Sequence, residues 1–268
     1  MKLHWFHLRP YGLVRGLCHA WAGWSLCRKF GASLRVLSLD GLNSMTTAWN
    51  FLETMEGRPQ PRTIIDVGAN RSQMSRLLLL AYRDSSLVYS FEPNPDLKPT
   101  GTVFTLALSN RDGVSPFFIP RQDDGWASLH PQEPNPSPDQ YRIVDVPVAR
   151  FETLVEQHKF PWDSMQRPVL LKIDTEGNEL RVLDGFGRYL TGVDYIMLEA
   201  GNTKRGSVEE DLFAITELLA RFGFNRSKVL YAAHEAHRAP IYMDMLFWRE
   251  KSEGESNGFK HQTFNSKD

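Results

Sequence analysis

The segment Thr63–Ser75, which reads TIIDVGANRSQMS, most constrains what this chain can fold into. A short apolar run is followed by a polar turn around Gly68, and apolar residues then recur at helical spacing from Met74. The pattern predicts a buried strand, a tight loop and a helix. This is the opening unit of a nucleotide-binding α/β fold, because the free N–H groups at a helix N-terminus attract an anionic group of a ligand.

The glycine pattern of this loop decides between two classes of ligand. A dinucleotide site uses G-x-G-x-x-G, so that the backbone can approach a pyrophosphate. Here Gly68 stands without the other glycines, Asn70 follows it, and Ser72 falls where another glycine is expected. Asp66 is a poor neighbour for a pyrophosphate but suits a cation. The loop therefore favours S-adenosylmethionine, which carries an ammonium and a sulfonium, and an NAD-linked reductase is a more distant alternative.

A second acid ends the next predicted strand. The segment Val88–Pro95 reads VYSFEPNP, which places Glu92 about twenty residues after the first loop. A carboxylate at that position can bind two ribose hydroxyls. A single acid at a strand end is more often a helix cap, but two acids at the tips of successive strands fit an adenosyl ligand.

Three more motifs follow in order: ALSNRDG (107–113), LLKIDTEGNELRVLDGF (170–186) and YIMLEAGN (195–202). With IDVGAN and FEP ahead of them, the chain resembles the FkbM-type family of S-adenosylmethionine-dependent methyltransferases over roughly residues 63–248, and KIDTEGNE is the most specific part. The resemblance implies an α/β fold with a Rossmann-like seven-stranded sheet. That sheet is mostly parallel, with a terminal antiparallel strand and helices on both faces.

We expect three regions: an N-terminal helical extension (1–60), a methyltransferase domain (61–250) and a disordered polar tail (251–268). The extension interleaves basic and aromatic residues, and its apolar runs are too interrupted for a membrane span. A helix packed on the core or on a second subunit is the favoured interpretation, and peripheral membrane contact is the alternative.

Composition bounds the partners and the compartment. The net charge is −1, so no overall basic field favours nucleic acid. Cys18 and Cys27 are the only cysteines, and they indicate neither a disulfide framework nor a thiolate metal site. We therefore expect a cytoplasmic protein that acts on a small molecule, with a homo-oligomer as an open alternative.

The candidate catalytic residues follow the fourth and fifth predicted core strands. Asp174 and Glu176 come after one strand and Glu199 ends the next, so all three should reach one crevice beyond the strand ends. A hydroxyl is a poor nucleophile and needs a base or a metal to accept its proton. The carboxylates could hold Mg²⁺, or they could bind the methionine ammonium and a substrate hydroxyl without metal, and the sequence leaves both open.

His234 is a further candidate base. It lies in the connection 233–240, which the family topology places on the ligand face, and its unperturbed pKa is near 6.5. A solvated loop histidine is the more common alternative.

The expected cofactor-binding residues gather at the strand tips. They are Asp66, Gly68, Asn70, Ser72, Glu92, Ser109, Asn110 and Asp174. Ser109 and Asn110 are expected to offer polar partners to the adenine edge, although Asn-Arg-Asp-Gly is also good turn chemistry. The family usually has glycine at the position of Ser72, and we expect the serine to cap the next helix and bind the cofactor carboxylate.

A long polar segment, 120–140, lies between two further predicted strands. The family has a similar insertion with a Ser-Leu pair, matched here by Ser128 and Leu129. Long loops are usually functional or disordered, and we expect a lid over the acceptor site.

The predicted function is S-adenosylmethionine-dependent transfer of a methyl group to a hydroxyl. The family resemblance makes a sugar or another natural-product intermediate the expected acceptor. The alternative is a methyltransferase-like domain that no longer turns over and serves as a binding scaffold.

Overall fold

The computed structural model describes residues 39–82, 86–131, 136–201, 212–234 and 240–250, which places most of the expected N-terminal extension and the polar tail outside the described residues. The main helices are α2 (Leu39–Thr54), α3 (Gln73–Ala81), α4 (Phe151–Glu156), α5 (Glu179–Phe186) and α6 (Leu212–Arg221). The strands are β1 (Thr63–Val67), β2 (Leu87–Phe91), β3 (Thr102–Phe104), β4 (Ala107–Leu108), β5 (Gly113–Pro120), β6 (Tyr141–Ala149), β7 (Val169–Ile173), β8 (Tyr195–Gly201), β9 (Arg226–His234) and β10 (Pro240–Trp248).

One sheet of seven strands carries the fold, in the order β3-β2-β1-β7-β8-β10-β9. The pairs from β3 to β8 are parallel, and β10 is antiparallel to both β8 and β9. Strand order reverses between β1 and β7, which is where such sheets bind ligands. The predicted Rossmann-like α/β fold, mostly parallel with a terminal antiparallel strand, is confirmed.

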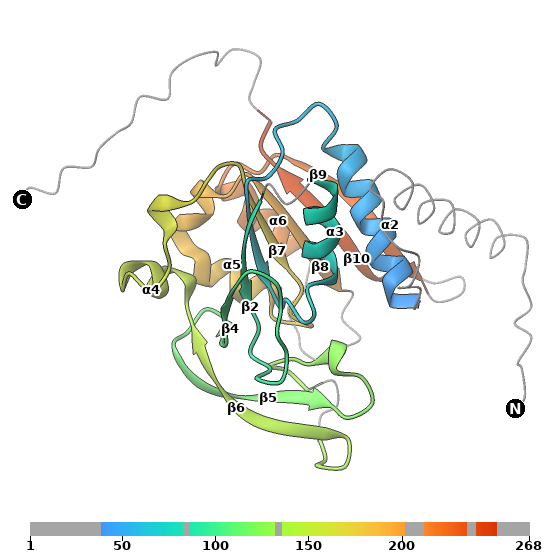
Figure 1. Cartoon of the computed structure of the whole chain (residues 1–268), viewed down its shortest axis with the longest axis vertical. Helices are drawn as coiled ribbons and strands as arrows, with labels where there is room; N and C mark the ends of the chain where they lie inside the picture. Colours follow the sequence, from blue (N-terminus) through green and yellow to red (C-terminus); the bar gives the residue numbers. More distant parts are fainter. Residues whose placement is uncertain (1–38, 83–85, 132–135, 202–211, 235–239, 251–268) are drawn as a thin grey trace, which may run out of the picture.

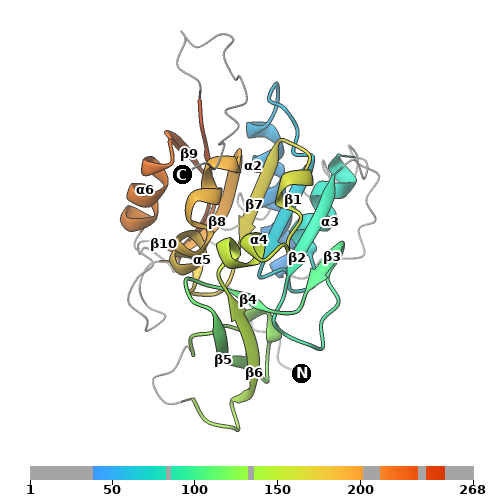
Figure 2. The same ribbon diagram turned by 90° about the vertical axis from the view of Figure 1, so that its left-hand side faces the viewer.

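Helices cover both faces of this sheet (Figure 2). On one face Phe51 of α2 and Leu78 of α3 pack with Ile64 of β1. On the other face Phe186 of α5 joins a larger core that contains Ile65. All these side chains are fully buried, and each contributes roughly 1.5–3 kcal/mol through removal of apolar surface from water.

The central strands β1 and β7 are buried along their whole length. Parallel strands of this kind are nearly continuous apolar runs, and each of these two is interrupted by one charged residue. Asp66 of β1 and Lys172 of β7 are register partners. Side chains alternate along a strand, so both point to the α2/α3 face, as Ile64 does.

The segment 102–108 forms two short strands that belong to different sheets. β3 joins the main sheet, whereas β4 pairs with β6 in a second sheet of order β4-β6-β5 (Figure 1). The chain turns between them, where Leu106 N donates to Phe104 O at 2.9 Å. Residues 92–101 contain no helix.

Helix α2, which lies in the expected N-terminal extension, is packed into the same core as the sheet. Asn50 Nδ2 donates to Leu230 O at 2.6 Å, and Met55 is buried beside Phe51. Within the described residues, no helix combines the length and the apolar character that a bilayer span requires. The position of α2 matters because one side of it reaches the ends of the strands.

Candidate functional site

A crevice of about 360 Å³ opens beyond the carboxyl ends of the parallel strands. It is lined by the loop after β1, the ends of β7 and β8, the start of β10, and α2. Its charged lining residues are Arg71, Asp123, Lys172, Asp174, Glu176, Glu199 and Asp244. We call it the acidic crevice, because carboxylates outnumber basic groups among these residues.

Gly68 lets the loop after β1 pass against the end of β7. It has φ +70°, and a Cβ atom there would lie 1.8 Å from the main-chain oxygen of Asp174. No other residue fits this approach without moving the backbone. The glycine of the motif therefore brings the loop to the end of the neighbouring strand.

Glu92 holds the loops after β1 and β2 in place. It is buried, and its two oxygens accept bonds from Asn70 N (2.7 Å) and Asn94 N (2.8 Å). Burial raises the pKa of Glu92, and the two backbone bonds oppose that rise. Glu92 also lines a small, mostly apolar cavity of about 30 Å³. Gly68 lines both this cavity and the acidic crevice.

Two of the predicted cofactor residues bind within the protein instead of facing a cavity. Asp66 is fully buried, where Ser75 Oγ donates to its Oδ2 at 2.6 Å. Ser72 adopts φ +57°, a left-handed conformation that explains the family's preference for glycine. Its Oγ accepts from Thr100 N at 2.9 Å and makes no bond to the start of α3, so the expected helix cap is wrong.

Ser109 and Asn110 lie beyond β4 and line neither cavity. Ser109 is buried with its Oγ 3.4 Å from Asn178 Oδ1. Asn110 Nδ2 donates to Asp184 Oδ2 of α5 at 3.1 Å. Both side chains thus have hydrogen-bond partners within the protein, and their assignment to the adenine edge stays a prediction.

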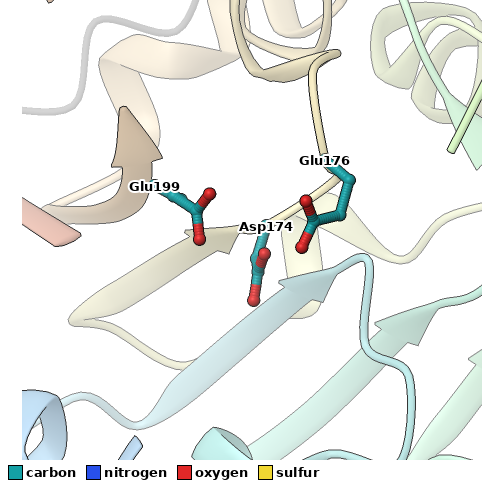
Figure 3. Close-up of side chains that lie close together, drawn as sticks. All are labelled: Asp174, Glu176 and Glu199. Carbon is teal, nitrogen blue, oxygen red and sulfur yellow. The ribbon is translucent and has the colours of Figure 1, made fainter. Parts of the chain in front are cut away.

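The structure brings together the three predicted catalytic carboxylates. Asp174 follows β7, Glu176 lies in the next loop and Glu199 is on β8, and one oxygen of each lies within 4.8 Å of the others (Figure 3). Glu176 has φ +55°, and Ser128 Oγ donates to its main-chain oxygen at 2.7 Å. The loop conformation and this bond set the position of Glu176.

The sequence did not reveal a further carboxylate, Asp244 of β10. It is the register partner of Glu199 across the antiparallel pair, so the two share a sheet face. Thr47 Oγ1 of α2 donates to Asp244 Oδ2. The available signal was an acid within the apolar strand sequence IYMDMLFW. The hydrogen bond to α2 joins residues that are 197 positions apart in the sequence.

Burial and mutual repulsion raise the pKa values of the carboxylates in this part of the crevice. The pKa of Glu199 is raised well above its usual range, first by burial and then by Asp174 and Asp244. Burial also raises the pKa of Asp244 to about 7, against the opposing effect of the bond from Thr47. These raised pKa values reflect burial together with the excess of carboxylates over basic groups in the lining of the crevice.

Lys172 is the second residue that the sequence analysis missed. Its Nζ lies 3.1 Å from Asp66 Oδ1, 3.3 Å from Asp174 Oδ2 and 3.1 Å from Gly68 O. Burial alone would lower the pKa of Lys172, but Asp66 and Asp174 together outweigh it and raise the pKa, so the group stays an ammonium. A lysine inside the strand VLLKI was the signal.

The predicted base His234 ends β9, and its side chain lies outside the described residues. Because β8 and β9 are both antiparallel to β10, β9 ends at the edge of the sheet where β8 ends. The connection to β10 thus leaves from the ligand edge, as the topology predicted. The catalytic role of His234 stays a prediction.

The insertion between β5 and β6 contacts both loops of the site. Arg71 donates to the two carboxylate oxygens of Asp124 at 2.7 Å each, and Asn70 Nδ2 lies 3.4 Å from Asp124 O. Trp126 lines the crevice and Ser128 binds the loop after β7. The segment thus lines the crevice beside the loops after β1 and β7, and its role as a lid stays a prediction.

The fold and the site define a class, that of nucleotide-binding α/β enzymes with an acidic crevice at the strand-order reversal. Residues 66–226 match the family model described as the methyltransferase FkbM domain. The chain belongs to this family, and it is an S-adenosylmethionine-dependent methyltransferase. None of the curated proteins compared with the chain matches it.

Several solved structures resemble the chain at low identity. A precorrin-6y C5,15-methyltransferase from Geobacter metallireducens is 10% identical (TM-score 0.38; 83% of this chain, 96% of that chain). An O-methyltransferase from Thermotoga maritima is 10% identical (0.36; 83% and 69%). The plantazolicin methyltransferase BpumL with SAH is 8% identical (0.37; 86% and 90%). The chain spans 41% of EvdMO1. Similarity this low transfers no function.

Asp244 links the stability of the ligand-free protein to pH. Its pKa is about 7 in the folded protein and near 3.9 when unfolded, so the folded state binds more protons between these values. Stability is then lost as pH rises through 7, by at most about 1.4 kcal/mol per pH unit. We expect thermal melts to show a lower Tm at pH 8 than at pH 6, and Asp244→Asn to flatten this slope.

The control for this measurement is Asp145→Asn, which changes an exposed carboxylate of β6. It should keep the wild-type slope. An unchanged slope in Asp244→Asn would show that this residue is not the group that takes up protons.

Proposed function

We propose that this protein transfers the methyl group of S-adenosylmethionine to a hydroxyl of a small-molecule acceptor, a sugar or another natural-product intermediate. The observation that carries the proposal is the acidic crevice at the strand-order reversal. Its carboxylates repel one another, and its buried cation, Lys172, is already shared by Asp66 and Asp174. A ligand with a sulfonium and an ammonium supplies the missing positive charge.

The two cavities divide the cofactor between them. Glu92 lines the apolar cavity with lone pairs left on both oxygens, so ribose hydroxyls can bind there while adenine occupies the apolar side. The methionine end then passes Gly68, which lines both cavities, and enters the acidic crevice. Opening of the apolar cavity is part of this proposal, because about 30 Å³ holds only water-sized groups.

The acceptor binds on the side of β8, β10 and α2. Thr47 and Asp244 lie there, outside the family match of residues 66–226 but in the lining of the same crevice. Carboxylates accept hydrogen bonds from hydroxyl groups, and their charge disfavours phosphate-bearing acceptors. A neutral, hydroxyl-rich molecule is the acceptor that suits this wall.

Methyl transfer is an in-line displacement in which a new O–C bond forms as the S–C bond breaks and S-adenosylhomocysteine leaves. The enzyme mainly aligns the two reactants. The acceptor proton passes to a carboxylate in this mechanism. Asp174 and Glu199 are the proposed bases, and Glu176 or His234 is the alternative.

A cytoplasmic location and an oligomeric state remain expectations from composition.

A metal-free mechanism is the version that we propose. Asp174, Glu176 and Glu199 have the oxygen donors that Mg²⁺ prefers, but the Lys172 ammonium lies 3.3 Å from Asp174 and already compensates its charge.

We therefore expect methyl transfer to survive dialysis against EDTA with less than about a twofold loss, within assay error. A loss that Mg²⁺ restores would establish the metal-dependent alternative. Addition of Zn²⁺ or Ca²⁺ after the same dialysis separates a specific requirement for Mg²⁺ from a general effect of divalent ions.

Glu92→Ala should raise the Kd for S-adenosylmethionine by roughly tenfold or more, because it removes the ribose acceptors and two loop bonds worth about 1–3 kcal/mol. Isothermal titration measures this directly. Asp96→Ala is a matched control, because Asp96 is a solvent-exposed acid in the same loop. Millimolar or absent binding in the wild type would favour the scaffold alternative instead.

Asp174→Asn should lower turnover by about 100-fold or more, because the amide cannot accept the acceptor proton. The acceptor is first identified by mass spectrometry of hydroxyl compounds incubated with isotope-labelled cofactor. Circular dichroism should show an unchanged fold. Near-normal turnover in this variant would remove Asp174 from the role of base and leave Glu199 in its place.

A further inference from the structure

We propose that Lys172 is a positioning residue, which fixes Asp174 and the loop after β1 so that the methionine end of the cofactor can bind. The proposal rests on the function proposed above. It assigns to a buried lysine a part in the reaction that acts through its neighbours and not through contact with the reacting atoms.

The position of Lys172 would be unfavourable without a specific role. It lies in the central strand of the sheet and is 8% exposed, and its four strand neighbours are fully buried apolar residues. A buried ammonium is stable only when it is paired and hydrogen-bonded. Here it has three oxygen partners, one on each of three segments.

These partners belong to the segments that must meet at the site. Asp66 is the register partner of Lys172 on β1, Gly68 O belongs to the loop after β1, and Asp174 follows β7. Rotation of Asp66 is blocked, because its other oxygen accepts from Ser75 Oγ. The Lys172 ammonium therefore connects the loop after β1 and the fixed carboxylate of Asp66 to Asp174 at the end of β7.

The loop and β7 also meet through the backbone. The position of a Gly68 Cβ would lie 1.8 Å from Asp174 O, so the two backbones are in contact. A shift of the Lys172 ammonium would change both sides of this contact together. This is why removal of Lys172 should disturb the cofactor loop more than the loss of one ion pair would.

Lys172 leaves the second oxygen of Asp174 for a ligand. The ammonium contacts Oδ2, and the side chain of Asp174 is 42% exposed at the crevice. Asp174 is then held in one orientation. The raised pKa of Lys172 keeps the lysine an ammonium, which makes it unsuitable as a general base and supports a positioning role.

The experiment compares the affinity for two probes, S-adenosylmethionine and 5′-methylthioadenosine, in purified full-length protein. The second probe keeps the adenosyl part but lacks the amino-acid end. In Lys172→Met we expect the Kd for S-adenosylmethionine to rise at least tenfold and that for methylthioadenosine to stay within twofold. A general loss of structure would weaken both probes equally.

A double variant, Asp66→Asn with Lys172→Met, guards against a failure to fold. It removes the buried acid that Lys172→Met leaves unpaired, so the Tm should return most of the way to that of the wild type. The Kd for S-adenosylmethionine should remain at least tenfold raised, because Asp174 and Gly68 O still lack the ammonium. Leu190→Ala, a core change in the segment 187–192, should lower the Tm without changing either Kd.

Three outcomes would overturn the proposal. They are a Kd for S-adenosylmethionine within twofold of the wild type in either lysine variant, an equal loss of affinity for both probes, and a double variant that regains both Tm and affinity. Absent binding of S-adenosylmethionine to the wild type would instead overturn the proposed function.

Discussion

The rest of the site depends on one interaction, the pair of salt bridges that Lys172 forms with Asp66 and Asp174. It joins β1 and β7, the two strands between which the strand order reverses. Backbone pairing and apolar packing hold these strands together along their length, Asp174 N donates to Val67 O at 3.0 Å where they end, and the lysine adds the side-chain link between those ends. Removal of one partner from a buried pair of this kind typically costs about 3–5 kcal/mol, because a charge remains without compensation. The site is thus built on a contact that contributes to specificity more than to net stability.

The same contact explains the electrostatic character of the crevice. Lys172 pairs with its two acidic neighbours, and Arg71 pairs with Asp124 at the rim of the crevice. Glu199 and Asp244 are register partners beside them, and their pKa values are raised first by burial and then by neighbouring carboxylates, against the opposing effect of Lys172. A cationic ligand stabilises the ionised forms of these carboxylates. The preference for S-adenosylmethionine then follows from the charge distribution as well as from the family.

The sequence predicted the parts of the fold that depend on local pattern. The strand, tight loop and helix that begin at Thr63 were predicted as observed, and the convergence of Asp174, Glu176 and Glu199 followed from parallel strands ending at one edge. Contacts between distant segments could not be predicted in the same way. The Thr47–Asp244 bond joins residues 197 apart, and no periodicity reports such a pair. The expected helix cap by Ser72 was wrong because the direction of its side chain depends on a left-handed backbone conformation that the sequence does not reveal.

Helix α2 gives the molecule a modular character. The segment that matches the family, 66–226, supplies the loops after β1, β2 and β7, whereas α2 and the start of β10 supply the opposite wall. On the proposed function this wall binds the acceptor, so substitutions in it should alter which molecule is methylated while the loops that hold the donor stay intact. The Thr47–Asp244 hydrogen bond holds the two parts of this wall, α2 and β10, together.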